Sequence, residues 1–318
     1  MKRRDAMGLL MLGAGGAAWG QAYPSRPIRL IAPFTAGGGT DMIARSLAER
    51  IGASMGQPVV VDNRSGGIGV IGTDLTAKSP PDGYTIMIAT PTFTVNPSMM
   101  SRLPYDIIRD FAPVSLVARS PHLLAINPKL PVSTVAELVA YGKSNPLSFS
   151  SSGSGASSHL AAELFSSLTG VKMTHVPYRG TGDAALAVVT GTVSLAFLDT
   201  QTLLPLIKGG RLRGLAVTGP QRSPAAPELP TMVELGYSRF LSGVWYGIVA
   251  PAHTPPDVIA RLNAEIVKAV RGPELQSILR REAAEPVGSS AAEFGELIKA
   301  ELQRWGTVIR EAGIPPTN

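Results

Sequence analysis

The sequence predicts an α/β fold built on parallel strands, and three observations support this prediction. Short apolar runs alternate along the chain with amphipathic segments of helical period. The 34 glycines and 27 prolines among 318 residues fall below the share found in low-complexity sequences, so they indicate many short turns. Hydrophobic residues make up 44% of the chain and charged residues only 16%, which argues against disorder and favours about two packed domains.

The first 22 residues have the pattern of a secretory signal peptide. A basic segment (residues 2–4) precedes an uncharged apolar run (7–19), and small residues at 20 and 22 fit cleavage before Tyr23. The apolar run is shorter than the roughly 20 residues that a membrane span needs. We therefore expect export to a bacterial periplasm by the Sec route, while Arg3-Arg4 leaves the twin-arginine route open.

Composition excludes several function classes. The chain has no cysteine, so disulfides, thiol nucleophiles, Cys-ligated metals and a lipoprotein anchor are excluded. The net charge is +6, and it falls to +4 without the signal peptide, which holds three basic residues and one acidic residue. Because no block of Lys and Arg occurs beyond the N-terminus, we expect no nucleic-acid binding.

The first half of the mature chain begins with a buried strand over 28–34. The next helix has Ile43, Leu47 and Ile51 spaced by four on one face, and it ends at Gly56. Short apolar runs then predict strands over 59–62, 84–90 and 123–126. Thr134 and Glu137 form a capping box that opens a helix, which stops at Gly142.

The second half continues the alternation. A helix is predicted over 158–169, where it follows a Gly/Ser turn, and another over 256–270, where Ile259, Leu262 and Ile266 are in register. The last helix opens at the capping box of Ser290 and Glu293 and extends at least to residue 309. Strands are predicted over 147–150, 174–177, 195–198, 215–217 and 246–249.

Three turns between a strand and a helix are candidate anion sites. They span residues 35–41, 150–158 and 178–183, and each is rich in glycine or serine. Backbone N–H groups without shielding side chains, together with a helix N-terminus, attract an anion without needing a cation. The alternative interpretations are an ordinary tight turn for the first and a flexible linker for the second. Arg179 in the third turn either pairs with an anion or is solvated.

Other motifs point to no chemistry. The G-x-G-x-x-G over 67–72 does not follow its strand directly, and no acidic residue ends the next strand, so a dinucleotide site is not expected. The four histidines lack the spacing of metal ligands, so we expect no metal and no cofactor. No G-x-S-x-G elbow or P-loop occurs. Asp199 either receives a ligand ammonium or caps the next helix. Trp245 and Tyr246 are expected in a core or hinge.

A set of motifs resembles one known family. They occupy residues 23–28 (YPSRPI), 33–41 (PFTAGGGTD), 62–67 (DNRSGG), 81–85 (PDGYT), 176–180 (VPYRG), 214–218 (GLAVT), 229–231 (LPT) and 245–247 (WYG). In order and spacing these motifs resemble the Bug family, the periplasmic receptors of tripartite tricarboxylate transporters. The resemblance covers residues 23–318. Ser65 and Asp183 depart from the usual family residues.

The resemblance implies a two-lobed periplasmic binding protein of type II, in which each lobe is a mixed, mostly parallel sheet flanked by helices. Lobe one would comprise 23–122 and 247–318, and lobe two 123–246, with crossings near 115–123 and 243–249. The ligand would be a small organic carboxylate or an amino acid in the interlobe cleft. The implied ligand-binding residues are Thr35, Ala36, Gly37, Gly38, Asp41, Thr90, Thr92, Ser152, Ser154, Ser157, His159, Arg179, Gly180 and Asp199.

The predicted function is therefore that of a receptor that binds a solute without converting it. The expected partners are membrane transporter subunits or a sensor kinase, and the expected oligomeric state is a monomer. An exported α/β enzyme that acts on a small carboxylate is the alternative.

Overall fold

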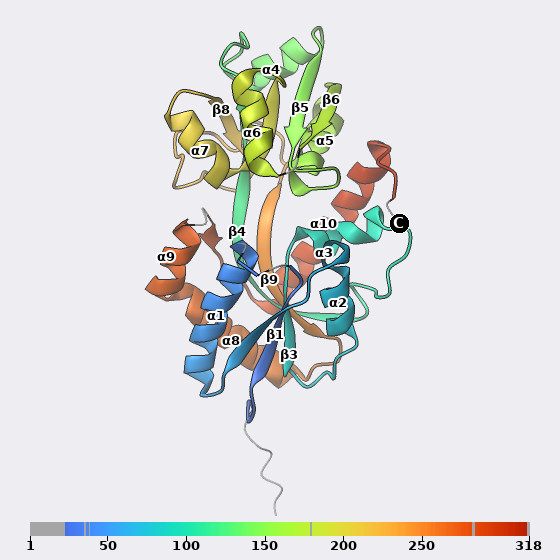
Figure 1. The fold of residues 1–318 in the computed structure, drawn as a ribbon, viewed down its shortest axis with the longest axis vertical. Coiled ribbons are helices and arrows are strands. Elements are labelled where there is room, and N and C mark those ends of the chain that lie inside the picture. Colours follow the sequence, from blue (N-terminus) through green and yellow to red (C-terminus); the bar gives the residue numbers. More distant parts are fainter. Residues whose placement is uncertain (1–22, 35, 38, 179, 282–283, 317–318) are drawn as a thin grey trace, which may run out of the picture.

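The computed structural model describes residues 23–34, 36–37, 39–178, 180–281 and 284–316. The predicted signal peptide (1–22) lies outside the described residues, as do three of the predicted ligand-binding residues, Thr35, Gly38 and Arg179. Figure 1 shows two groups of helices and strands, one above the other, joined by the long strands β4 (Phe111–Ile126) and β9 (Gly243–Pro251).

The first sheet forms the lower group. Its strands β1 (Ile28–Ala32), β2 (Val59–Asn63) and β3 (Thr85–Ala89) are parallel, in the order β2-β1-β3, and β9 and then β4 continue the sheet. The short β10 (Glu285–Pro286) pairs with β4. The helices of this group are α1 (Gly39–Met55), α2 (Val70–Ala77), α3 (Pro91–Met99), α8 (Pro256–Arg271), α9 (Pro273–Arg281) and α10 (Ala291–Glu311).

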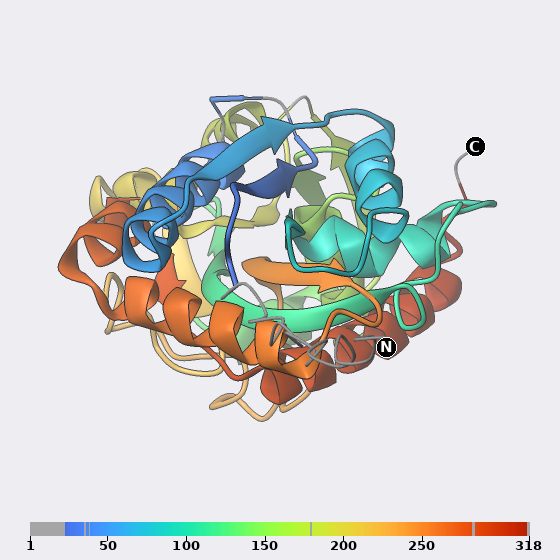
Figure 2. The same cartoon turned by 90° about the horizontal axis from the view of Figure 1, so that it is seen from below.

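Side chains that alternate between the two faces of this sheet pack against helices on both sides. Leu30 and Ile86 belong to a core with α1 and α8, whereas their neighbours Ile31 and Met87 belong to a core with α10. Successive side chains of a strand point to opposite faces, so each strand contributes to both cores. The view from below in Figure 2 shows α1 and α2 on opposite sides of these strands.

The second sheet forms the upper group in the same way. Strands β7 (Leu195–Asp199), β5 (Leu147–Ser151) and β6 (Met173–Pro177) are parallel, and β8 (Arg213–Val217) and β7 both pair with β4 in antiparallel orientation. Leu124 and Phe197 face one core, and Leu123 and Leu198 the other. The helices here are α4 (Val135–Gly142), α5 (Ser157–Thr169), α6 (Thr181–Thr190) and α7 (Thr200–Lys208).

Strand β4 takes part in both sheets. It pairs with β9 from Phe111 to Pro121, and with β7 from His122 to Ile126. The apolar pattern predicted only the second part of this strand (123–126), while the family resemblance implied a crossing near 115–123. The first part contains Pro113, Pro121 and two irregularities in its pairing with β9, which break the pattern of an apolar strand.

One hydrophobic core extends beyond the second sheet. Phe149 and Leu160 of the upper group pack in the same cluster as Met99 at the end of α3 and Trp305 and Ile309 near the end of α10. The two groups therefore share a packed contact in addition to the crossing strands β4 and β9 (Figure 1).

Local signals in the sequence are confirmed. Ser290 forms a complete capping box with Glu293, and the Thr134 hydroxyl accepts from the Glu137 N–H (3.1 Å). The Gly67–Gly72 motif forms a short 3-10 helix (Gly67–Gly69) and the start of α2. A Cβ at Gly72 would lie 2.8 Å from Cβ of Pro33, so this glycine permits close packing of α2 on the first strand. Among the described residues, no helix is long and apolar enough to cross a membrane.

Candidate binding cleft

The loop after β1 is held by a buried carboxylate. Asp41, in the first turn of α1, is 4% exposed, and its side chain accepts from the Gly37 N–H, Arg45 Nε and Asn63 Nδ2, each at 2.9 Å. Burial raises the pKa of this carboxyl, but these hydrogen bonds outweigh burial and hold the pKa below its ordinary value. Asp41 therefore shapes the loop from inside, while Ala36 and Gly37 are exposed.

The second predicted loop of the first sheet forms the N-terminus of α3. Thr90 occupies the N-cap position but its side chain makes no capping hydrogen bond, and its hydroxyl lies 3.1 Å from that of Thr92. Thr92 Oγ1 lies 3.7 Å from the position that a Cβ on Gly69 would take, which places this pair beside the Gly67–Gly69 turn.

The Gly/Ser loop after β5 is organised by neutral hydrogen bonds. The Ser158 hydroxyl accepts from the Ser152 N–H (3.0 Å) and lies 3.0 Å from the Ser152 hydroxyl. Ser151 Oγ donates to the Gly153 carbonyl (3.0 Å). Ser154 lies in the same turn. This turn, for which a flexible linker was the alternative interpretation, is thus a compact loop that closes on the first turn of α5.

Two histidines contact this loop and support it. His159 is 5% exposed and its Nδ1 accepts from the Gly155 N–H (3.0 Å), while its Nε2 lies 3.4 Å from Oε1 of Glu163. Its ring stacks on His175 with 3.9 Å between centroids. Nε2 of His175 lies 2.6 Å from Ser151 Oγ. Both ring nitrogens of His159 thus contact other groups of the protein, so His159 supports the loop.

A third histidine, not predicted as a site residue, lies behind Asp199 and Ser157. His122 is fully buried, with Nε2 at 3.3 Å from Ser157 Oγ and 3.6 Å from Asp199 Oδ1. Its Nδ1 lies 3.1 Å from Ser242 Oγ. Burial lowers the pKa of His122, against the opposing effect of Asp199, so the imidazole is neutral at pH 7.

Asp199 occupies the N-cap position of α7, but its side chain makes no capping hydrogen bond. It is one of the seven residues that line a cavity of about 220 Å³ between the two sheets. The others are Gly39 and Thr40 of α1, Ser120 of β4, Gln201 of α7, and Val244 and Tyr246 of β9. The cavity therefore joins the N-termini of two helices from different sheets across the crossing strands.

The chemistry of this cavity suits an anion held by dipoles. Among the described residues that line it, none is Lys or Arg, and Asp199 alone is charged. Backbone N–H groups at the first turns of α1 and α7 and the hydroxyl of Thr40 can act as donors. Of the predicted residues, the structure brings Asp199 to the cavity directly. Ser157 adjoins Asp199 through His122, and Gly180 begins α6 with φ 105°. Thr90, Thr92, Ser152 and Ser154 are not among the lining residues.

The sequence interpretation missed four lining side chains, those of Thr40, Ser120, Gln201 and Tyr246. Tyr246 was expected in a core or hinge, and it lies on the crossing strand β9, where it lines the cavity. Its neighbour Trp245 packs edge-on against Phe294, with 5.6 Å between the ring centroids. Alternation along β9 explains the difference, because adjacent residues of a strand face opposite sides. No group of three or more residues able to hold a metal occurs in the described part of the chain.

Comparisons with known proteins agree with one another. Residues 43–314 match the family described as the tripartite tricarboxylate transporter family receptor. Protein BugT of Bordetella pertussis is 39% identical, over 96% of this chain and 96% of its own length.

Three solved structures are similar over nearly their whole length. R. palustris Rpa4515 with adipate is 37% identical, covers 93% of this chain and 100% of its own, and superimposes with a TM-score of 0.73. MatC of Rhodopseudomonas palustris with bound malate has 29% identity, coverages of 90% and 100%, and a TM-score of 0.69. A TctC solute binding protein from Polaromonas with no ligand has 28% identity, coverages of 91% and 99%, and a TM-score of 0.85. These similarities confirm the predicted fold class.

Proposed function

The chain belongs to the tripartite tricarboxylate transporter receptor family, as its motifs predicted, and from this premise we propose that it binds a small organic carboxylate without converting it. The observation that carries the proposal is the cavity between the sheets, where the N-termini of α1 and α7 meet across the crossing strands without a lining Lys or Arg. The adipate-bound and malate-bound relatives support a ligand of this class.

The proposed mechanism is docking followed by closure. A carboxylate group binds the exposed N–H groups and hydroxyls at the helix N-termini, and rotation about β4 and β9 buries it between the two groups of elements. We propose that these groups are the predicted lobes, 23–122 with 247–318 and 123–246. The change of partner of β4 between Pro121 and His122 supports this boundary.

The described conformation fits the open state of such a cycle. The chain superimposes with a TM-score of 0.85 on the Polaromonas protein with no ligand, but with 0.73 on the adipate-bound protein, although the latter has the higher sequence identity. Residues 1–22 remain a predicted signal peptide, and we propose that the mature receptor works in the periplasm. The closed receptor would be recognised by membrane transporter subunits.

Asp199 is proposed to set the preference among carboxylates. Its side chain faces the cavity without capping α7, so it can receive an ammonium group of an amino dicarboxylate. We predict that Asp199→Asn lowers affinity for amino dicarboxylates, relative to plain dicarboxylates, by about tenfold or more, the size expected for one hydrogen bond to a charged group. Titration calorimetry with glutamate, aspartate, malate and adipate measures the ratio.

The matched control is Asp257→Asn, which neutralises an exposed carboxylate in the first turn of α8. If Asp199→Asn leaves the ratio of affinities for amino and plain dicarboxylates unchanged, the proposed role of Asp199 is wrong. A thermal-shift panel of mono-, di- and tricarboxylates tests the function itself, because a ligand at about 100 times its Kd adds about 2.7 kcal/mol of stability. No response to any carboxylate contradicts the proposed function, and turnover of a bound carboxylate would replace it with the enzyme alternative.

A further inference from the structure

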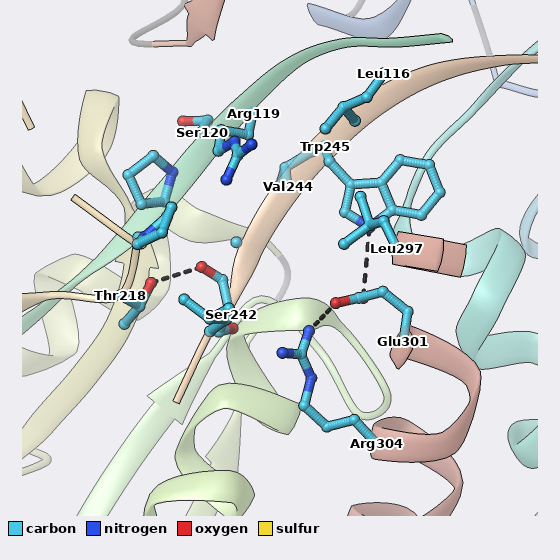
Figure 3. Close-up of a pocket in the computed structure, with 15 residues that line it drawn as sticks. Leu116, Arg119, Ser120, Thr218, Ser242, Val244, Trp245, Leu297, Glu301 and Arg304 are labelled. Atoms are coloured by element: carbon cyan, nitrogen blue, oxygen red, sulfur yellow. Dashed lines mark hydrogen bonds and ion pairs between the residues drawn. The ribbon is translucent and has the colours of Figure 1, made fainter. Parts of the chain in front are cut away.

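A second cavity, of about 80 Å³, lies beside the crossing strands (Figure 3) and shares Ser120 and Val244 with the cleft. We refer to it as the back cavity. Its walls are residues 119–121 of β4, 218–220 after β8, 241–245 around the start of β9, and the side of α10 that carries Leu297, Glu301 and Arg304. Trp245, which pairs with Arg119 across the strands, lines the back cavity, whereas the next residue, Tyr246, lines the cleft.

Among the described residues that line the back cavity, the one carboxylate, Glu301, already has partners. Glu301 is 4% exposed, and its Oε2 accepts from Nε1 of Trp305 (2.6 Å) and from Nε1 of Trp245 (3.4 Å). Its Oε1 forms an ion pair with Arg304. These contacts satisfy Glu301 and fix the α10 side of the cavity.

The described residues that line the back cavity include two arginines but only one carboxylate. Arg304 is largely buried, and its Nε has no hydrogen-bond partner. Arg119 extends into the cavity in Figure 3 and forms no hydrogen bond or ion pair with the other lining residues. Glu285, the residue opposite Arg119 in the β4–β10 pair, does not line the cavity, but its carboxyl interacts with the charge of Arg119. Burial raises the pKa of Glu285, and Arg119 acts to lower it. Among the described lining residues, two guanidinium groups and one carboxylate therefore occupy a cavity whose remaining walls are mainly apolar.

The charge and size of the back cavity select its ligand. The described lining residues carry one guanidinium more than carboxylates, which favours a monoanion, and guanidinium groups bind carboxylates through charge-assisted hydrogen bonds. Leu116, Leu241, Val244 and Leu297 leave room for an alkyl group but would desolvate a second charge. The volume of about 80 Å³ limits the ligand to a short chain.

We propose that the back cavity is a second binding site, distinct from the cleft, that takes a short-chain aliphatic monocarboxylate. Arg119 and Arg304 hold the carboxylate, and the alkyl group packs on Trp245 and Leu297. The site is connected to the cleft, because Ser242 lines the back cavity and bonds to His122, whose other nitrogen lies beside Ser157 and Asp199.

Propionate is the probe, and tryptophan fluorescence is the readout. The chain has three tryptophans, of which the two in the described residues, Trp245 and Trp305, both donate to Glu301, so their emission reports on this cavity. We expect a saturable change of fluorescence with propionate. Arg119→Gln should raise the Kd about tenfold or more, the size expected for one charged hydrogen bond. Leu297→Phe, which fills the cavity, should abolish the change.

The controls separate this site from the cleft and from misfolding. Arg211→Gln removes an exposed guanidinium elsewhere and should leave the Kd unchanged. Asp199→Asn alters the cleft and should leave propionate binding in place, while succinate should bind the back cavity more weakly than propionate. Thermal unfolding checks that each variant folds. Absence of saturable binding, equal binding by Arg119→Gln, or loss of binding in Asp199→Asn alone would overturn the proposal, and none of these outcomes depends on whether the cleft binds a dicarboxylate.

Discussion

The loops after β1 and β5 are both predicted to hold the ligand, but different chemistry supports them. In the first, one buried carboxylate, Asp41, ties Gly37 to Arg45 and Asn63. In the second, serine hydroxyls and the stacked rings of His159 and His175 support the loop. The difference teaches that the first loop depends on one strong centre, whereas the second depends on several weak contacts and on the protonation state of His175.

Removal of the charged centre should have the largest effect. Asp41→Ala leaves the Gly37 N–H and the Asn63 amide without their acceptor and should lower the free energy of unfolding by about 3 kcal/mol, as expected when two hydrogen-bond donors lose a buried carboxylate. Urea denaturation measures the change. Glu49→Ala, which removes an exposed carboxylate of the same helix, should change stability by less than about 0.5 kcal/mol. Equal losses in the two variants would show that the buried hydrogen bonds do not carry the stability.

Acid should destabilise the histidine-braced loop first. Burial, together with the nearby His159, lowers the pKa of His175 to about 4, from an ordinary value of 6.5. The unfolded chain therefore binds this proton at a higher pH than the folded chain, and stability falls as the pH decreases from about 6.5 to about 4. The lowered pKa of His122 acts in the same direction. For Asp41, whose pKa is also lowered, stability is lost only as the pH falls below its unfolded value of about 3.9.

Urea midpoints measured across this pH range test the difference between the loops. His175→Asn should flatten the decrease between pH 6.5 and 4, whereas His253→Asn, at an exposed position with φ 64° that asparagine tolerates, should retain it. The same slope in His175→Asn and in the unaltered protein would contradict the assignment of this pH dependence to the stacked histidines.

Loss of one weak contact should have the smallest effect. Ser158→Ala removes the acceptor of the Ser152 N–H at a 2% exposed position and should cost about 1 kcal/mol of stability. Ser166→Ala, further along α5, serves as the control for a serine of the same helix and should cost less. A loss in Ser158→Ala as large as that in Asp41→Ala would show that the second loop also depends on a single centre.

Local chemistry made much of the fold predictable from the sequence. The N-cap of Thr134, the capping box of Ser290 and the glycine turns involve neighbours in the chain, so the local sequence predicts them. Strand β4 was only partly predicted, because prolines interrupt its pattern and its two partners lie far away in sequence. The positions of the candidate site residues were harder to predict. His122 appeared as one isolated histidine, and only the pairing of β4 with β7 places it beside Asp199.

The central claim, that one carboxylate binds loops of both sheets, is tested most directly by hydrogen exchange followed by mass spectrometry. The carboxylate with the largest thermal shift is added at saturation, and exchange is compared with that of the free protein. The account predicts slower exchange in the segments 36–45 and 151–160 and at the start of α7, because the ligand and lobe closure protect their N–H groups. Protection confined to one sheet, or absent from both loops while the ligand is bound, would contradict it.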